Sequence, residues 1–295
     1  MIVLTESSES LAPSASARDI AASTNAAGLT GCDVYHIPSD FADCEDAEGA
    51  LWHVPPRKQV ECGVWIGYIP DPERYGAIYA AALAKGIRLV NSPEEHRVAQ
   101  EFDAAYPFLR GLTPESLIIR DAAECDSALA TLGLPIFVKG AVQSRKARGW
   151  KACVAETSDE LRLTAALLEL PNRSRGRVVL RKLAPLRYTR CSAEGFPFGR
   201  EYRLFVWREC ILGLGYYWEG EDALKALSAA EEECVRSLAQ EAARRLAVPY
   251  VAIDVGQLED GNWIVIETGD AQFSGVSQIP LLQLWSNIAR IPKPG

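Results

Sequence analysis

The stretch Tyr250–Gly275, YVAIDVGQLEDGNWIVIETGDAQFSG, holds two runs of alternating apolar residues on either side of the four residues EDGN. An Asp-Gly pair between two such runs is the strongest short-range signal for a β-hairpin. With this pair as the two loop residues, Asp254 lies directly opposite Glu267. Like charges that face each other across an antiparallel pair destabilise the sheet, and a cation between them removes that cost. The sequence therefore predicts a hairpin with two facing acids.

Two interpretations of these acids are open. They are either solvated on an exposed face or ligands of a hard cation such as Mg²⁺, which prefers oxygen ligands. The flanking runs are apolar enough for burial on at least one side. Polar and small residues follow at once, namely Gly269, Asp270, Gln272, Ser274 and Gly275. This context favours a metal–phosphate site.

The composition of the 295-residue chain is that of a globular protein, with 48% hydrophobic and 24% charged residues. The net charge of −8, with a pI near 5.1, argues against a general binder of nucleic acid or of anionic membranes. A local basic run between Arg173 and Arg190 is the exception. It is either a solvated edge or a strand that faces an anion.

The eight cysteines form no Cys-x-x-Cys pair and no zinc spacing with a histidine. We therefore expect them to be small buried residues in a reducing compartment. No apolar run approaches the roughly 20 residues that span a bilayer. The first residues, MIVLTESSES, lack the basic and apolar regions of a signal peptide. Together these features predict a cytoplasmic location.

Three units are predicted along the chain: residues 1–110, 111–176 and 177–295. In the first, strands and helices alternate around an acidic loop at Asp40–Gly49, which predicts a mostly parallel sheet. The second contains an expected helix Asp121–Leu132, strands Pro135–Lys139 and Trp150–Ala155, and a helix from Thr157 to Leu170. The third begins with strand Val178–Leu183 and continues with a hairpin of Glu201–Val206 and Ile211–Trp218 and a helix after Ser228.

The residues around Lys139 are candidates for phosphate binding. Lys139 ends an apolar strand, and the loop GAVQSRKARG follows, with Ser144 and Lys146 among its polar side chains. A flexible loop with backbone amides and cations suits a triphosphate. The alternatives are a solvated lysine and a disordered hairpin tip. No P-loop motif and no G-x-G-x-x-G motif occurs in the chain.

A second candidate pair is Glu201 and Arg203, which are two residues apart and so lie on one face of a strand. They are either a weak surface pair or a site where the arginine neutralises charge on a transferred phosphoryl group. Hydrolase triads are disfavoured, because only three histidines exist and G-x-S-x-G is absent. We expect His36, His53 and His96 to be structural or surface groups.

In this order, the motifs PIFVK, GAVQSRKARGWKAC, RVVLRKL, E-x-R-x-F-V, A-I-D-V and V-I-E-T-G-D resemble the ATP-grasp superfamily. The chain looks closest to the clade marked by an arginine and two lysines, and it is more distantly similar to eukaryotic cell-division-cycle ATP-grasp proteins. The resemblance implies a mixed α/β and α+β class. Its first part would be a Rossmann-like pre-ATP-grasp unit, followed by a lid subdomain and a C-terminal subdomain that carries the Mg·ATP site.

The resemblance also implies roles for single residues. Lys139, Lys146 and Ser144 would bind phosphates, Arg181, Lys182 and Leu183 would form the adenine-reading linker, and Glu201 and Arg203 would complete the nucleotide site. Lys146 and Arg203 would be the catalytic cations. Asp254 and Glu267 would hold Mg²⁺. The family usually has E-x-N at the last site, where this chain has Glu267-Thr268-Gly269, so Asp270 would substitute by a one-residue shift.

The implied activity is that of an ATP-dependent carboxylate–amine ligase with an acylphosphate intermediate, acting on a small molecule or a peptide. The alternative is an ATP-binding assembly factor without ligase turnover, and a kinase-like phosphotransferase ranks below both. Tyr216, Trp218, Glu219, Gln272 and Ser274 are candidates for substrate contact by adjacency alone. The sequence does not reveal the acid, the amine or the oligomeric state.

Overall fold

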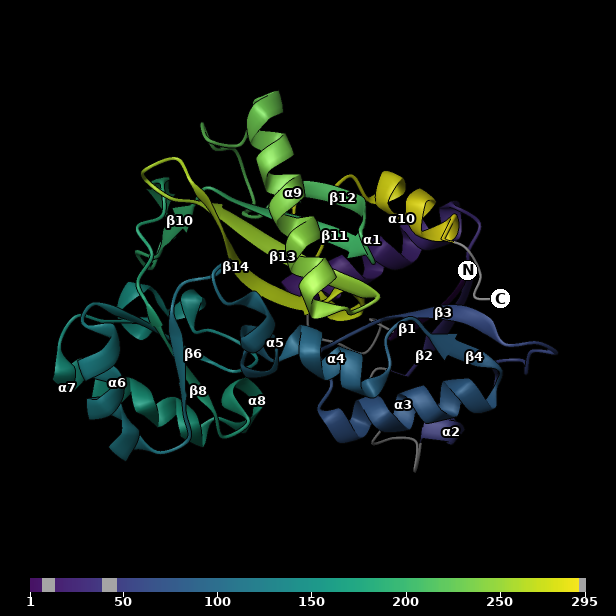
Figure 1. Cartoon of the computed structure of the whole chain (residues 1–295). Helices are drawn as coiled ribbons and strands as arrows, with labels where there is room; N and C mark the ends of the chain where they lie inside the picture. The colour runs from purple at the N-terminus through teal and green to yellow at the C-terminus, as the bar shows by residue number, and fades with distance from the viewer. Residues whose placement is uncertain (7–13, 39–46, 292–295) are drawn as a thin grey trace.

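The structure is a computed structural model that describes residues 1–6, 14–38 and 47–291. Most of the expected acidic loop at Asp40–Gly49 lies outside the described residues. Figure 1 shows the three units. An N-terminal unit and a middle unit lie side by side below a C-terminal sheet, with helices α4 and α5 between the two lower units. Helix α1 leaves the N-terminal unit and packs beside α10 at the C-terminal sheet.

The N-terminal unit contains a four-stranded sheet in the order β2-β1-β3-β4, and all of its strand pairs are parallel. The predicted parallel sheet is confirmed. Its elements are β1 (Ile2–Glu6), α1 (Ala15–Leu29), β2 (Asp33–Ile37), α2 (Ala47–Ala50), β3 (Glu61–Ile66), α3 (Pro72–Ala84) and β4 (Ile87–Leu89). The chain moves from β1 to β2 on one side of the sheet and then to β3 on the other, so the order of the strands reverses at β1.

Two short helices, α4 (Pro93–Gln100) and α5 (Phe102–Leu109), connect the N-terminal and middle units. Ser92 and Glu95 form a capping box at the start of α4. At the junction of the helices, the buried Glu101 forms ion pairs with Arg175 and Arg177 of the middle unit. The backbone amide of Phe102 donates to Ala141, so this junction is also tied to the start of the basic loop.

The middle unit is built on an antiparallel sheet in the order β5-β8-β6-β7. Its elements are β5 (Ser116–Ile119), η2 (Ala122–Glu124), α6 (Cys125–Leu132), β6 (Ile136–Gly140), η3 (Lys146–Arg148), η4 (Trp150–Ala152), β7 (Val154–Ala155), α7 (Ser158–Thr164), η5 (Ala165–Glu169), α8 (Pro171–Ser174) and β8 (Val178–Lys182). Strand β8 belongs to this sheet, so the sheet of the middle unit includes residues beyond 177, where the third unit was expected to begin.

Two local predictions for the middle unit are wrong in part. The expected strand Trp150–Ala155 is a 3-10 turn followed by two strand residues. Alternation of apolar side chains suggested a strand, but Gly149 has φ +85° and its Cα lies against the backbone of Glu194, which forces a turn here. The expected helix from Thr157 to Leu170 is α-helical only to Thr164 and continues as a 3-10 helix.

The C-terminal sheet has the order β12-β11-β13-β14, and all its pairs are antiparallel. Its elements are β9 (Tyr188–Cys191) and β10 (Pro197–Gly199), which pair separately, β11 (Glu201–Trp207), β12 (Cys210–Tyr216), α9 (Ala229–Leu246), β13 (Tyr250–Gln257), β14 (Trp263–Asp270), η6 (Ala271–Phe273) and α10 (Leu281–Ala289). Helix α9 covers one face, with Val235, Ala239, Ala242 and Leu246 in its core.

The predicted register of the hairpin is confirmed, because Asp254 is the partner of Glu267. The predicted two-residue loop is wrong. The amide of Leu258 donates to the carbonyl of Asn262, so the loop contains one residue more than expected. A bulge between Asp254 and Val255 shifts the register back. The two irregularities cancel, and the two acids still face each other.

Among the described residues, the cysteines are free thiols, as expected. Cys32, Cys62, Cys125 and Cys153 are buried, but Cys191, Cys210 and Cys234 are exposed, so the expectation of burial is wrong for these three. No helix in the described part of the chain combines the length and the apolar character needed to cross a membrane.

Candidate functional site

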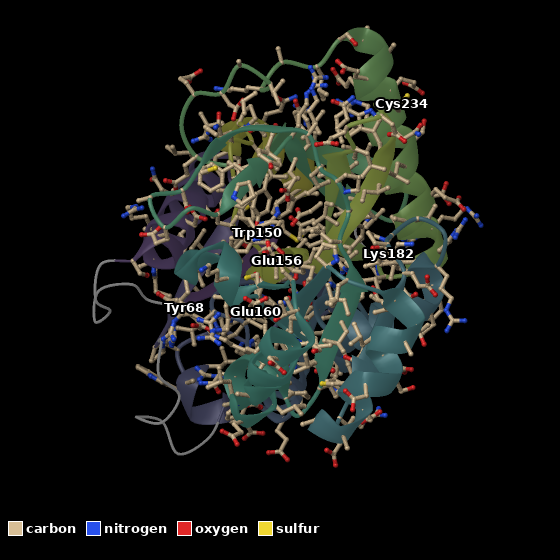
Figure 2. All side chains as sticks on the ribbon, turned by 90° about the vertical axis from the view of Figure 1, so that its left-hand side faces the viewer. Tyr68, Trp150, Glu156, Glu160, Lys182 and Cys234 are labelled. Carbon is tan, nitrogen blue, oxygen red and sulfur yellow. The ribbon has the colours of Figure 1, made fainter. Side chains whose placement is uncertain are left out.

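A cavity of about 260 Å³ lies between the middle unit and the C-terminal sheet. It is lined by eight of the residues predicted from the sequence, namely Lys139, Ser144, Lys146, Arg181, Lys182, Leu183, Glu201 and Glu267. In Figure 2, two of the residues that line the cavity are labelled, Trp150 near the centre of the view and Lys182 to its right. Motifs that are separate in the sequence thus contribute residues to one cavity.

Lys139 and Glu267 form an ion pair at this cavity. The Lys139 side chain is 2% exposed. Burial lowers the pKa of Lys139, although Glu267 opposes this shift. Burial alone would raise the pKa of Glu267, but the charges of Lys139 and Lys146 outweigh it and lower this pKa to about 2. Glu267 is therefore ionised at neutral pH, and the ion pair holds the two side chains together.

Arg181 is a second buried cation in the cavity wall. Its Nη1 donates to the carbonyl of Ile266 at 2.6 Å, and its guanidinium lies 4.2 Å from the centre of the Phe102 ring. Lys139 contacts the same ring at 5.3 Å. The Nε and Nη2 atoms of Arg181 have no partner, and burial lowers its pKa to about 10. A buried donor without a partner is costly, so this side chain suits an anionic ligand.

The basic loop places Lys146 on the opposite side of the cavity. Its Nζ lies 5.2 Å from the ring centre of Tyr217 and 5.3 Å from that of Trp218. Burial opposes the charge of Lys146, but Tyr217 and three carboxylates outweigh this effect and raise its pKa. One of these carboxylates is Glu201, which is 3% exposed and whose Oε2 has no partner. Burial raises the pKa of Glu201, although Lys146 opposes this.

Two glycines fix the ends of the basic loop. A Cβ on Gly140 would lie 2.1 Å from the carbonyl oxygen of Arg173, and one on Gly149 would lie 2.3 Å from that of Glu194. Real Cβ atoms do not approach this closely, so only glycine fits either position. The carbonyl of Ser144 also accepts from Arg173 Nη1 at 2.6 Å. The loop is therefore held over the cavity from two sides.

Arg203 and Asp254 form a bidentate ion pair beside the cavity rather than in its wall. Arg203 Nε and Nη2 each donate to a carboxylate oxygen of Asp254 at 2.7 Å. Arg203 Nη1 donates to the carbonyl of Gly275, and its guanidinium lies 4.7 Å from the centre of the Tyr217 ring. Burial opposes the charge of Arg203, but Asp254 outweighs it and raises its pKa. This pair borders the end of the cavity where Glu267 lies.

Asp270 is not placed with the other two acids. It is fully buried, its Oδ2 lies 2.8 Å from His96 Nδ1, and its Oδ1 accepts from the backbone amide of Gln272. Strand side chains alternate between faces, so the side chain of Asp270, three residues after Glu267, points to His96 of helix α4. The expectation that Asp270 substitutes for Gly269 as a metal ligand therefore finds no geometric support. His96 has the structural role expected of it.

The predicted substrate contacts are only partly placed near the cavity. Tyr216 is buried against Tyr202 in the core beneath α9, and its neighbour Tyr217 faces the site instead. Trp218 stacks on Phe198 near Lys146. Glu219 is exposed, and Gln272 bonds to the backbone amide of Trp65 and to the hydroxyl of Tyr75. Ser274 lines a separate small cavity next to Arg203.

The apolar walls of the cavity could not be assigned from the sequence. They come from the middle sheet, the 3-10 turn and the segment between β8 and β10, and include Phe137, Trp150, Leu186, Phe196 and Ile266. Lys182 and Leu183 lie at the start of this segment, where β8 ends. An apolar slot that leads to a cluster of cations is the shape expected of a site for a base attached to phosphates.

These residues fit a nucleotide with a divalent cation. Lys139, Lys146 and Arg181 line the polar end of the cavity, and the Nε and Nη2 donors of Arg181 have no hydrogen-bond partner. Asp254 and Glu267 come from adjacent strands, and Mg²⁺ is commonly held by one or two carboxylates together with substrate phosphates and water. Within the described residues there is no group of three or more His, Cys, Asp or Glu side chains that could hold a metal by itself. Phosphate oxygens would have to complete any such site.

The fold and the site define a protein of three units with a cavity between the middle unit and the C-terminal sheet, lined by cations and by apolar side chains. A family model matches residues 131–288, which is more than half of the chain. It describes an ATP-grasp domain, family 3 of the clade marked by an arginine and two lysines. The chain belongs to this family of ATP-grasp domains. A search of the curated proteins found no match.

Several solved structures share the fold over nearly the whole chain. A RimK domain ATP-grasp protein from Sphaerobacter thermophilus matches with a TM-score of 0.61 and 15% identity, covering 98% of both chains. The D-alanine–D-alanine ligase of Bacillus anthracis matches with a TM-score of 0.61 and 15% identity, over 98% of this chain and 91% of the other. The ATP-grasp ligase PsnB, complexed with a minimal precursor, matches with a TM-score of 0.59 and 16% identity over 98% of each chain. At these identities the likeness establishes the fold.

Proposed function

We propose that the protein is an ATP-dependent ligase that joins a carboxylate to an amine through an acylphosphate. The observation that carries this proposal is the set of cations around Glu267. Lys139 pairs with the Glu267 carboxylate, and Lys139 and Arg181 both lie over the ring of Phe102. Both of these cations are buried in the cavity wall. A set of buried cations is suited to binding a polyphosphate rather than to contact with water.

We assign the nucleotide contacts from the cavity wall. The apolar slot that contains Trp150 and Phe196 would hold the base, next to Lys182 and Leu183. The side chain of Arg181 points to the cluster around Glu267, so we assign it to phosphates, whereas the resemblance assigned it to the linker that reads the adenine. Lys139, Lys146 and Ser144 would bind the phosphates from the other sides, with Glu201 between the slot and the cations.

Asp254 and Glu267 would hold Mg²⁺, which supplies charge neutralisation at the phosphates when it is bound. In the structure, Asp254 is paired with Arg203, and Glu267 is paired with Lys139. Triphosphate oxygens would attract these two cations, which frees carboxylate oxygens for the metal. We therefore propose that the ion pairs hold the site in a preformed, neutral arrangement until the nucleotide arrives.

The proposed reaction has two steps. A substrate carboxylate oxygen attacks the γ-phosphorus of ATP, the bond to the bridging oxygen breaks, and ADP leaves with that oxygen. The neutral nitrogen of an amine then attacks the acyl carbon, phosphate leaves with the carboxylate oxygen, and a proton is lost from nitrogen. Two anions meet in the first step, so Arg203 and Lys146 would lower its barrier by neutralising the γ-phosphoryl group.

A second candidate function is that of an ATP-binding assembly factor without ligase turnover. Gly269 favours it, because this residue lacks a side chain two positions after Glu267, where the family usually has a metal-binding asparagine. A protein that binds ATP but turns it over slowly could tolerate this loss. The two candidates differ in whether ADP release depends on an added carboxylate.

Trapping with hydroxylamine separates the two candidates. The purified chain is incubated with Mg²⁺, ATP, hydroxylamine and a panel of amino acids and short peptides. A ligase converts its acid to a hydroxamate and releases an equal amount of ADP, because hydroxylamine replaces the unknown amine. Nucleotide binding without hydroxamate across the panel would contradict the ligase and favour the assembly factor. Lys225→Ala, on an exposed surface segment, is the matched control for Lys139→Ala.

A further inference from the structure

A second polar crevice lies in the N-terminal unit, at the carboxyl ends of β1 and β3. The order of the strands reverses between these two strands, and ligands of open α/β sheets bind outside the carboxyl ends of the strands at such a switch point. Glu6 ends β1, and Gly67 follows β3. A Cβ on Gly67 would lie 2.4 Å from Glu6 Oε1, so the absence of a side chain leaves room for this carboxylate.

The Glu6 carboxylate is buried and only partly satisfied. The side chain is 3% exposed, and its Oε1 accepts from Trp65 Nε1 at 3.2 Å. Its Oε2 has no partner. Burial raises the pKa of Glu6 to about 7, although the amide of Tyr68, the indole of Trp65 and the charge of Arg74 oppose this shift. A buried carboxylate with a free oxygen gains more from a cationic ligand than an exposed one does.

Two adjoining cavities meet at this point. One, of about 440 Å³, lies between α1 and the ends of β1 and β2 and is lined by Glu6, Thr24, Asn25, Gly28 and His36. The other, of about 120 Å³, is lined by Asp19, Gly67, Gln143, Ser274 and Gly275. Ile20 lines both cavities. Figure 2 shows Tyr68, which lines the smaller cavity, below the level of Trp150 on the same side of the molecule.

The smaller cavity leads to the proposed reaction centre. Gln143 comes from the basic loop, and Gly275 accepts a hydrogen bond from Arg203. A Cβ on Gly275 would lie 2.8 Å from Asp19 Oδ2 and 3.8 Å from Arg203 Nη1. A molecule that extends from Glu6 past Asp19 would therefore reach the side of Arg203 that faces away from the nucleotide cavity.

The charge of the crevice selects a class of ligand. Among the described residues that line the two cavities, Glu6 and Asp19 are acidic and none is lysine or arginine. A free carboxylate would be repelled here, whereas an ammonium group carries three donors and no acceptor. Glu6 and Asn25, which both line the larger cavity, are the acceptors that we assign to these donors.

We propose that this crevice binds the amine substrate of the ligase, with Glu6 as the counter-ion of an ammonium group on that substrate other than the neutral nitrogen that attacks the acyl carbon. The inference rests on the proposed function, which requires an amine but does not identify where it binds. Asp19 then lies on the path between the ammonium site and the acyl group, on the opposite side of Arg203 from the base of the nucleotide.

The test is a comparison of two small probes of equal length. The full chain, saturated with Mg²⁺ and AMP-PNP, is titrated calorimetrically with 1,4-diaminobutane or with 1,4-butanediol at equal ionic strength. The amine is expected to bind and the diol is not. Glu6→Gln should raise the Kd for the amine at least about tenfold, since a hydrogen bond to a charged group is lost. Glu94→Gln removes an exposed charge from α4 and should leave this Kd unchanged.

A second variant guards against a folding defect in Glu6→Gln. A Cβ on Gly28 meets no atom within 4 Å, so Gly28→Leu would fill part of the larger cavity without a clash. It should also abolish binding of the amine. Equal binding of the amine and the diol, no detectable binding of the amine, or an unchanged Kd in Glu6→Gln and Gly28→Leu would overturn the inference.

The outcome can be separated from that of the proposed function. Hydroxamate formation by the wild-type chain needs no amine other than hydroxylamine. A chain that forms hydroxamate but does not prefer the amine probe would contradict only the assignment of the crevice. A chain that forms no hydroxamate would contradict the ligase itself.

Discussion

The nucleotide cavity and the crevice of the N-terminal unit both contain buried acids, but their acids are in opposite states. In the cavity, Glu267 is paired with Lys139, and the pKa of Glu267 is lowered to about 2. In the crevice, Glu6 has a free oxygen, and burial raises its pKa to about 7. The first acid already has its counter-ion, and the second lacks one.

This difference indicates what each site is built to receive. A paired acid can release its cation to an incoming polyanion and take a metal ion in exchange, so the net charge of the site changes little. An unpaired acid can only be neutralised by a proton or by a cationic ligand. We therefore expect the cavity to respond to nucleotide and metal together, and the crevice to respond to amines and to pH.

The largest effect should come from the acids of the cavity. Asp254→Asn and Glu267→Gln should each lower ATP- and carboxylate-dependent ADP formation by about 100-fold or more, because the metal and the phosphates lose a charged ligand. Steady-state ADP release measures this effect. The Glu267 variant should also melt at a lower temperature, since Lys139 is left buried without its partner. Activity close to that of the wild type in both variants would remove these acids from the site.

A smaller effect is expected for the cations. Lys139→Ala should raise the Kd for Mg·AMP-PNP by about tenfold or more, since a charge-assisted contact to phosphate is lost. Lys225→Ala should change this Kd less than about twofold, because Lys225 is exposed and forms its ion pair with the exposed Glu221. Isothermal titration measures both values. Equal changes in the two variants would show that Lys139 is not a phosphate ligand.

The third prediction contrasts Asp270, which contacts His96, with the two acids that we assign to the metal. Asp270→Asn should lower the free energy of unfolding by about 2 kcal/mol or more, because His96 loses its buried hydrogen-bond partner. The affinity of the folded variant for Mg·AMP-PNP should stay close to that of the wild type. Chemical denaturation and titration distinguish the two effects. Loss of metal-dependent nucleotide binding with unchanged stability would instead return Asp270 to the metal site.

The smallest effect concerns stability in the absence of ligand. Because the folded pKa of Glu6 lies above its unfolded value, ionised Glu6 costs stability at high pH, and this cost disappears as the pH falls through 7 toward 4.5. Glu6→Gln should therefore raise the melting temperature at pH 8 and have little effect at pH 5. His36→Gln is the control for the imidazole that lines the same cavity. A lower melting temperature for Glu6→Gln at pH 8 would indicate that the free oxygen is paired in solution.

Much of this site could be predicted because its polar residues sit at fixed places in regular strands. Lys139 ends an apolar strand, and Glu201 and Arg203 share a face. The Asp-Gly signal predicted the hairpin, and Asp254 faces Glu267 because a bulge offsets the extra loop residue. Each prediction uses only local periodicity. The chain order of these strands then carried the resemblance to ATP-grasp proteins.

Other parts depend on packing between distant segments, which periodicity does not reveal. Phe102, which lies under both Lys139 and Arg181, comes from a connecting helix with no signal of its own. Tyr217 rather than Tyr216 faces the site, since the face of an edge strand is set by its partners. Glu6 could not be singled out either, because a glutamate after an apolar strand is ordinarily solvated. Only the tertiary fold buries its carboxylate.

The most direct measurement is a crystal structure of the chain with Mg²⁺ and AMP-PNP. We predict that oxygens of Asp254 and Glu267 lie about 2.1 Å from a shared or bridged Mg²⁺, and that Lys139 has moved from Glu267 to a phosphate. A nucleotide bound elsewhere, or bound with both acids still paired to Arg203 and Lys139 and no metal near them, would contradict this assignment.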